Sequence, residues 1–139
     1  MAKNTAQASE GTWLSTKPYS LGAKLSWPHP GERLSVDGKL PGLLIKAAKG
    51  DEVKSISSGK VIYSNPHATF GYVVMVLGDY GFTYLYGGND SSSLRMGDSV
   101  KTGDSIGQVG ETPGFPVPQI YFSTWKDGAY IDPASVPRD

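Results

Sequence analysis

The stretch GDSVKTGDSIGQVG, residues 97–110, decides the fold of this chain. It reads as a glycine turn, a short Val-Lys strand, a second turn and a returning apolar strand. A similar stretch, GDEVKSISSGKV, occupies residues 50–61. The repetition predicts a duplicated pair of β-hairpins, which fixes an architecture but no activity.

The rest of the chain continues this pattern of short strands. Its 139 residues include 18 glycines and 10 prolines, which separate short segments rich in Val, Ile, Tyr and Phe. No long stretch has helical periodicity, and glycine-centred turns between the segments favour antiparallel pairing. We therefore predict an all-β, antiparallel fold. The expected strands span residues 21–26, 43–47, 52–56, 59–64, 72–77, 82–86, 105–109 and 119–125.

Length and a hydrophobic content of 38% suit a single domain. Residues 1–12 are polar and lack periodicity, so we expect a flexible N-terminal arm there and a folded domain over residues 13–139. Residues 13–24 either add a strand or cross the surface groove described below. No apolar stretch reaches the length of a membrane span, and the first ten residues lack the hydrophobic centre of a secretory signal.

Charge and cysteine content exclude several classes of function. Lys plus Arg and Asp plus Glu both total 13, and no basic run is present, so nothing in the sequence favours a nucleic-acid partner. The chain has no cysteine, which excludes disulfides, thiolate zinc sites and cysteine nucleophiles.

Seven stretches in a fixed order carry a family resemblance. Together they resemble the zinc-peptidase domain of the LytM (lysostaphin-like, M23-type) family over nearly everything after Leu25. The resemblance implies the family's duplicated hybrid motif, a β-sandwich or barrel-sandwich hybrid. The stretches are LSWPHPG (25–31), GLLIKAAKGDEV (42–53), GKVIYS (59–64), FGYVVMV (70–76), TYLYG (83–87), VKTGDSIGQVG (100–110) and PQIYFSTWKDGAYIDP (118–133).

The residues that hold zinc in this family are replaced here. Aligning GLLIKA with the corresponding family stretch places Leu40 at the first histidine ligand and Leu44 at the aspartate ligand. The family's His-Leu-His signature falls on residues 119–121, so Gln119 replaces a catalytic histidine and Tyr121 replaces the third zinc ligand. Hydrocarbon side chains cannot coordinate zinc. The resemblance therefore implies a degenerate domain with no metal and no catalytic residue.

A second family element, Tyr-x-His-Leu, aligns with Tyr84-Leu85-Tyr86-Gly87 and has also lost its histidine. The chain's two histidines, His29 and His67, lie in proline-flanked stretches outside the motif positions. We expect His29 to be an exposed loop residue. His67 has a similar setting, in a loop that could border the groove.

The altered positions predict a binding groove. Alternate residues of a strand share a face, so Gln119, Tyr121, Ser123 and Trp125 point one way while Ile120 and Phe122 point into the core. Tyr84 and Tyr86 share a face by the same rule. Aromatic and leucine side chains suit protein recognition. The expected partner-binding groove contains Leu40, Leu44, Tyr84, Tyr86, Gln119, Tyr121 and Ser123.

Other interpretations of these residues stay open. Leu40, Leu44 and Tyr121 either recognise a partner or merely plug a redundant cleft. Trp125 either lines the groove or braces the turn at residues 126–128.

The resemblance implies a non-catalytic protein of the periplasm or cell envelope, without a cofactor, that binds and regulates peptidoglycan hydrolases in the manner of EnvC-type amidase activators. Direct binding of peptidoglycan by the same groove is the alternative. A zinc endopeptidase would lack its ligands at the family's spacing. A carrier domain modified on Lys46 is disfavoured, because Lys46 lies in an apolar strand and not at a hairpin tip.

Overall fold

The structure is a computed structural model that describes residues 26–112 and 114–138. The arm expected over residues 1–12, the segment 13–24 and nearly all of the strand expected over 21–26 lie outside these residues. Within the described part of the chain, no helix is long and apolar enough to cross a membrane.

Ten strands and one short 3-10 helix account for the ordered elements of the described residues. All strand pairings are antiparallel, which confirms the expected all-β class. The strands are β1 (Arg33–Val36), β2 (Gly42–Lys46), β3 (Glu52–Lys54), β4 (Gly59–His67), β5 (Gly71–Gly78), β6 (Thr83–Ser91), β7 (Ser99–Val100), β8 (Ser105–Val109), β9 (Gln119–Lys126) and β10 (Ala129–Tyr130), followed by the helix η1 (Pro133–Ser135).

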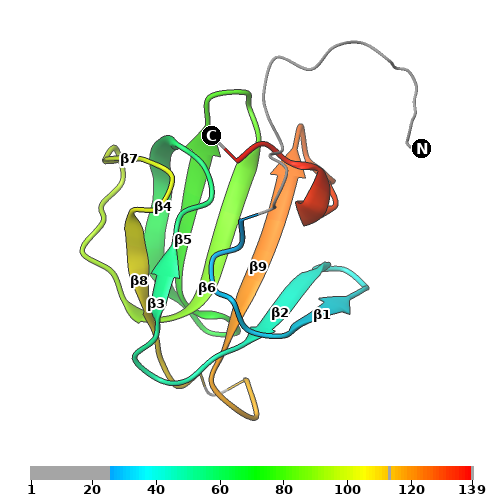
Figure 1. The fold of residues 1–139 in the computed structure, drawn as a ribbon, viewed down its shortest axis with the longest axis vertical. Coiled ribbons are helices and arrows are strands. Elements are labelled where there is room, and N and C mark those ends of the chain that lie inside the picture. Colours follow the sequence, from blue (N-terminus) through cyan, green and yellow to red (C-terminus); the bar gives the residue numbers. More distant parts are fainter. Residues whose placement is uncertain (1–25, 113, 139) are drawn as a thin grey trace.

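The main sheet has the order β1-β2-β9-β6-β5-β4-β7 (Figure 1). The sequence predicted that each repeated stretch forms its own hairpin, and this prediction is wrong. Instead they pair reciprocally: β3 of the first repeat pairs with β8 of the second, and β4 pairs with β7. Backbone hydrogen bonds join the same partners outside the strands, including Ser55 N–H to Asp104 O at 2.9 Å and Gly97 N–H to Val61 O at 2.8 Å. Each repeat thus completes the other.

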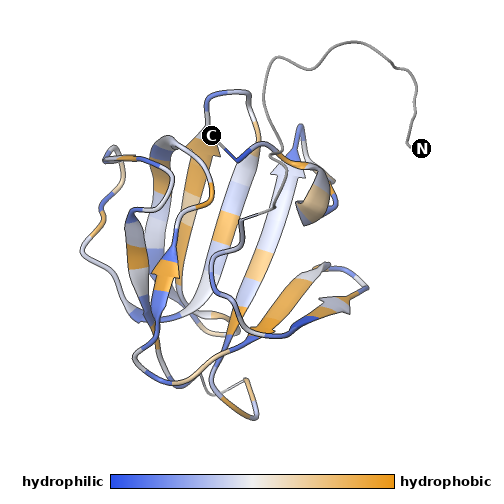
Figure 2. Cartoon of the chain, in the orientation of Figure 1, coloured by the Kyte–Doolittle hydropathy of each residue, from blue (hydrophilic) through white to orange (hydrophobic). Residues whose placement is uncertain are grey.

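The core lies on one face of the central strands. A cross-strand row runs from Leu43 through Phe122 and Tyr86 to Val74, and all four side chains are buried. In Figure 2, orange covers much of β2 and β5, whereas β6 and β9 are mostly pale with isolated orange bands. Val53 of β3 and Ile106 of β8 pack in the same core. The repeats therefore cover this face of the sheet, and the side chains that alternate with the core row project from the opposite face.

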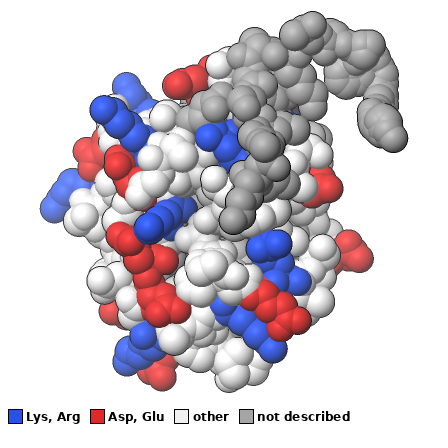
Figure 3. Space-filling view, viewed as in Figure 1, with Lys and Arg blue, Asp and Glu red and all other residues white. Residues whose placement is uncertain are grey.

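The visible surface carries charges of both signs. In Figure 3, acidic and basic side chains are interspersed over the described part of this face, with no large region of a single sign. This distribution matches the equal totals of 13 acidic and 13 basic residues in the sequence. Electrostatic recruitment of a strongly charged partner has no evident basis on this face.

Candidate functional site

Strand β9 separates the core from the functional face by simple alternation. Ile120 and Phe122 belong to the core cluster, as the sequence predicted. Tyr121 lies across from Leu44 on β2 and Gly87 on β6, and Trp125 lies across from Thr83. Because cross-strand partners share a face of the sheet, this register places the side chains of Tyr121, Leu44 and Trp125 on the face opposite the core.

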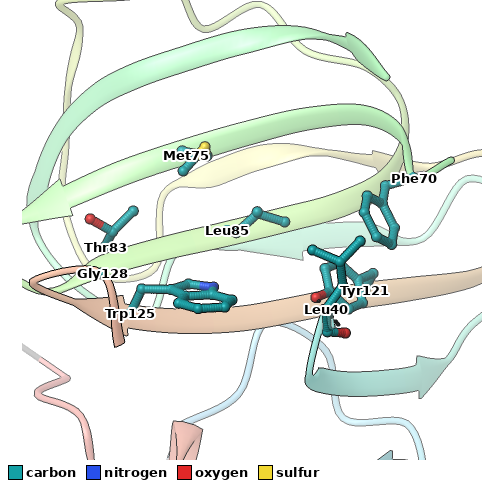
Figure 4. A pocket seen from close by; sticks show the side chains of 8 residues that line it. All are labelled: Leu40, Phe70, Met75, Thr83, Leu85, Tyr121, Trp125 and Gly128. Carbon is teal, nitrogen blue, oxygen red and sulfur yellow. Dashed lines mark hydrogen bonds between the residues drawn. The ribbon is translucent and has the colours of Figure 1, made fainter. Parts of the chain in front are cut away.

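A groove of about 340 Å³ opens on this outer face. Figure 4 shows Trp125 lying along β9, with Leu85 and Met75 beside it and Phe70, Leu40 and Tyr121 gathered at the other end. No charged side chain of the described residues lines it. The lining residues are Leu40, Phe70, Met75, Thr83, Leu85, Tyr121, Trp125 and Gly128.

Tyr121 contributes its ring to the groove but directs its hydroxyl elsewhere. The hydroxyl donates to the carbonyl oxygens of Leu40, at 3.1 Å, and Pro41, at 2.9 Å. The Ser123 hydroxyl donates to the same Pro41 oxygen at 2.7 Å. Burial raises the pKa of Tyr121, so its hydroxyl stays protonated. The polar atoms at this end of the groove are thus already satisfied by the protein.

An aromatic stack forms one end of the groove. The rings of Phe70 and Tyr121 lie almost parallel with centroids 4.2 Å apart, and His67 stacks on Phe70 at 5.2 Å. His67 itself is exposed and accepts a hydrogen bond from Thr69 N–H through Nδ1, at 3.1 Å. His67 is the last residue of β4 and not a loop residue as the sequence predicted, and it lies next to the groove through its contact with Phe70.

The placement of Tyr84 and Tyr86 in the groove is wrong. Both side chains lie in the core, 1% and 0% exposed, on the face of β6 opposite Leu85. The Tyr84 hydroxyl donates to Pro137 O at 2.7 Å, and the Tyr86 hydroxyl accepts from Ile56 N–H at 3.1 Å. The core tolerates both rings because each hydroxyl has a partner.

The remaining predicted residues lie around the groove without all lining it. Leu40 is 54% exposed and forms part of the wall, whereas Leu44 is half-buried beside Tyr121. Gln119 and Ser123 are buried on the Tyr121 face of β9 and do not line the groove. Trp125 contacts Tyr130 of β10 edge-to-face at 5.6 Å and also lines the groove. It therefore braces the hairpin of β9 and β10 and contributes to the groove.

Alternation on neighbouring strands could have identified two residues that the sequence reading missed. Met75 and Leu85 face each other across β5 and β6, and Leu85 also faces Ser123 of β9. Once Ser123 is placed on the outer face, this register brings Leu85 and Met75 with it. Phe70 lies in the turn before β5, and no sequence signal placed its ring against Tyr121.

His29 is not the exposed loop residue that the sequence predicted. Its side chain is 12% exposed, and its Nε2 lies 2.8 Å from Asp51 Oδ2. Since Nδ1 accepts a hydrogen bond from Gly31 N–H at 2.9 Å, the ring donates through Nε2. Hydrogen bonds from Ala48 N–H and from His29 lower the pKa of Asp51. This pair fixes the loop before β1 and lies apart from the groove lining.

The residues at the three positions implied as zinc ligands do not fit zinc. Leu40 and Leu44 have no donor atom, and the Tyr121 hydroxyl is engaged with two carbonyl oxygens. Zinc in proteins takes Cys, His, Asp or Glu ligands. Within residues 26–112 and 114–138, no group of three such side chains is arranged to hold a metal ion.

Comparison with known proteins agrees with this geometry. The model of peptidase family M23 matches residues 38–133. Over 103 residues, the chain is 35% identical to the murein hydrolase activator EnvC of Escherichia coli, covering 74% of this chain and 25% of the relative. Over 126 residues, it is 35% identical to the cell division protein DipM of Caulobacter vibrioides, covering 81% of this chain and 21% of the relative.

A solved structure extends the likeness to an active peptidase. The catalytic domain of the antimicrobial peptidase lysostaphin from Staphylococcus simulans superposes with a TM-score of 0.61 at 26% identity, covering 66% of this chain and 74% of that one. The chain spans only about a quarter of EnvC and a fifth of DipM. The shared part is therefore the domain that carries the groove.

Proposed function

The chain belongs to peptidase family M23, and from that premise we propose that it is a non-catalytic module of the cell envelope that binds and activates a peptidoglycan amidase. One observation carries the proposal: two of the three positions that the resemblance implies as metal ligands, Leu40 and Tyr121, line a largely apolar groove together with Phe70. A hydrolytic zinc site needs three protein ligands and an open coordination position. The groove offers apolar surface in their place.

The chemistry of the groove favours a protein segment as its occupant. Among the described residues its lining is mostly hydrocarbon and aromatic, with Thr83 but no charged side chain, and the Tyr121 hydroxyl is turned towards backbone carbonyls. Rigid aromatic and leucine side chains are typical of the energetically dominant centre of protein interfaces. We propose that two or three apolar side chains of a regulatory segment of the amidase enter the groove.

The relatives support both the partner and the compartment. EnvC is named as a murein hydrolase activator and DipM as a cell division protein. Murein is peptidoglycan, which lies outside the cytoplasmic membrane. We therefore place the present chain in the periplasm or cell envelope, with a part in wall remodelling or division.

Direct binding of peptidoglycan is the alternative that a binding experiment separates. The immobilised chain is exposed to a purified amidase that retains its regulatory segment, and in parallel the soluble chain is sedimented with purified sacculi. Amidase capture that is lost in Trp125→Ala supports the proposal. Sedimentation with bare sacculi without amidase capture refutes it and favours wall binding. The matched control is Trp27→Ala, which removes an indole outside the groove lining.

A further inference from the structure

The turn that joins β1 to β2, residues 37–41, forms one wall of the groove. Leu40 contributes a side chain that lines the groove although it is 54% exposed. An exposed turn residue is ordinarily free to move, and a mobile wall would make a poor recognition surface. The hydrogen bonds that hold this turn therefore bear on binding.

Two hydroxyl groups of β9 fasten the backbone of the turn. Tyr121 donates to Leu40 O at 3.1 Å and to Pro41 O at 2.9 Å, and Ser123 donates to Pro41 O at 2.7 Å. Residues Tyr121 and Ser123 are 3% and 0% exposed, so water has little access to replace these bonds. Leaving such a buried hydroxyl unpaired costs more than losing an exposed hydrogen bond.

The first residue of β2, Gly42, directly follows the turn and permits this close contact. A Cβ at Gly42 would lie 2.8 Å from the Phe122 carbonyl oxygen and 2.8 Å from Cε1 of Tyr121. Only glycine lets the chain approach the Tyr121 ring so closely. The same ring stacks on Phe70 at 4.2 Å. These two neighbours restrict the movement of the ring and so limit the directions open to its hydroxyl.

We propose that Tyr121 and Ser123 are positioning residues that form a latch, defined as the hydrogen bonds of their two hydroxyl groups to Leu40 O and Pro41 O, the single Tyr121 proton being shared between both oxygens. The latch fixes the turn so that Leu40 stands as a preformed wall of the groove, and in this way it sets the affinity for the partner segment. The inference rests on the proposed function. It assigns to the tyrosine that stands at a former ligand position a task in recognition and not only in filling space.

Single-atom substitutions test the latch while keeping the shape of the groove. Tyr121→Phe keeps the stacked ring and removes one hydroxyl, and Ser123→Ala removes the other. Tyr72→Phe is the matched control, because its hydroxyl contacts Ser64 Oγ at 2.9 Å and its ring does not line the groove. Two quantities are measured for each variant: amide hydrogen exchange at residues 37–40 and affinity for the purified amidase.

The latch predicts faster exchange in the turn for Tyr121→Phe and Ser123→Ala. It also predicts a roughly five-fold loss of affinity for each, the worth of about one hydrogen bond. Tyr72→Phe should change neither quantity, even if it lowers the melting temperature as much as the latch variants do. Unchanged exchange in the two latch variants would overturn the inference. If exchange accelerates but the wild-type chain binds no amidase, the proposed function fails while the role in holding the turn stands.

Discussion

The rings of Phe70 and Tyr121 are stacked nearly parallel, with centroids 4.2 Å apart and an angle of 10° between their planes. One comes from the turn before β5 and the other from β9, so the stack joins segments that are far apart in sequence. Both rings line the groove. Their contact places two stacked aromatic rings side by side in the wall of the groove.

Removal of one ring of this stack should affect binding more than folding. We expect Phe70→Ala to lower amidase affinity about ten-fold or more, because aromatic side chains at the centre of an interface dominate its energy. Its free energy of unfolding should fall by about 1–2 kcal/mol, because Phe70 is half-buried and its stack with Tyr121 is itself worth about 1 kcal/mol. Calorimetric titration and urea denaturation measure the two quantities. A variant that binds like the wild type would remove Phe70 from the recognition surface.

Core tyrosines should behave in the opposite way. Tyr86→Phe leaves the Ile56 N–H without its acceptor and should lower the free energy of unfolding by about 1–3 kcal/mol. Tyr86→Ala should lower it by about 3–5 kcal/mol through the cavity that it leaves. The folded fraction of Tyr86→Phe should bind the amidase normally. Weaker binding at wild-type stability would mean that Tyr86 reaches the groove after all.

Alternation along strands explains why part of the site was predictable and part was not. In β9, the apolar pair Ile120 and Phe122 marks the inner face, so the sequence placed Tyr121 correctly on the outer one. In β6, both faces carry large side chains, and alternation cannot say which set is inside. Tyr84 and Tyr86 can lie in the core because each hydroxyl has a partner there. The Tyr84 hydroxyl donates to Pro137 O, and the Tyr86 hydroxyl accepts from Ile56 N–H. Those partners are distant in sequence and leave no local signal.

The fold, too, was predictable where it depends on local sequence and not where it depends on long-range contacts. Most strands were predicted within a few residues, since period-two hydrophobicity is a local property. The reciprocal pairing of β3 with β8 and of β4 with β7 was not, because strand partners depend on long-range contacts between the repeats. The short strands β1, β7 and β10 were not among the eight expected strands, and β1 is the most exposed of them. Its short sequence, RLSV, has no buried face to make a pattern.

The buried tyrosines predict a loss of stability at alkaline pH. Burial raises the pKa of Tyr86 and of Tyr121 above the ordinary value of 10.0. Above pH 10 the unfolded chain loses phenolic protons that the folded chain keeps, so stability is complete below that pH and falls as pH rises towards the folded-state values. For the fully buried Tyr86 the slope is about 1.4 kcal/mol per pH unit. Urea midpoints measured from pH 8 upwards should stay level to about pH 10 and decline above it, less steeply in Tyr86→Phe. A flat profile would contradict the burial of this hydroxyl.

Restoring the lost ligands should restore a metal site. The combined change Leu40→His, Leu44→Asp and Tyr121→His supplies three zinc-binding groups at the positions implied as ligands. We expect the variant to retain zinc after dialysis and to melt at a higher temperature with zinc than without it, because a metal bound only by the folded state stabilises it.

The wild-type chain, treated in the same way, is the control and should retain no zinc. Stoichiometric zinc in the wild type, measured by elemental analysis, would contradict a degenerate site. If the triple variant also retains no zinc, the family's ligand positions lie elsewhere on the outer face.

The most direct test of the central claim is release of dye from labelled sacculi by a purified amidase in the presence and absence of this chain. We predict no release by the chain alone, a several-fold increase in release when it is added to the amidase, and loss of that increase in Phe70→Ala/Trp125→Ala with Tyr72→Phe unaffected. Release by the chain alone, or equal stimulation by the groove variant, would contradict a non-catalytic activator that works through the groove.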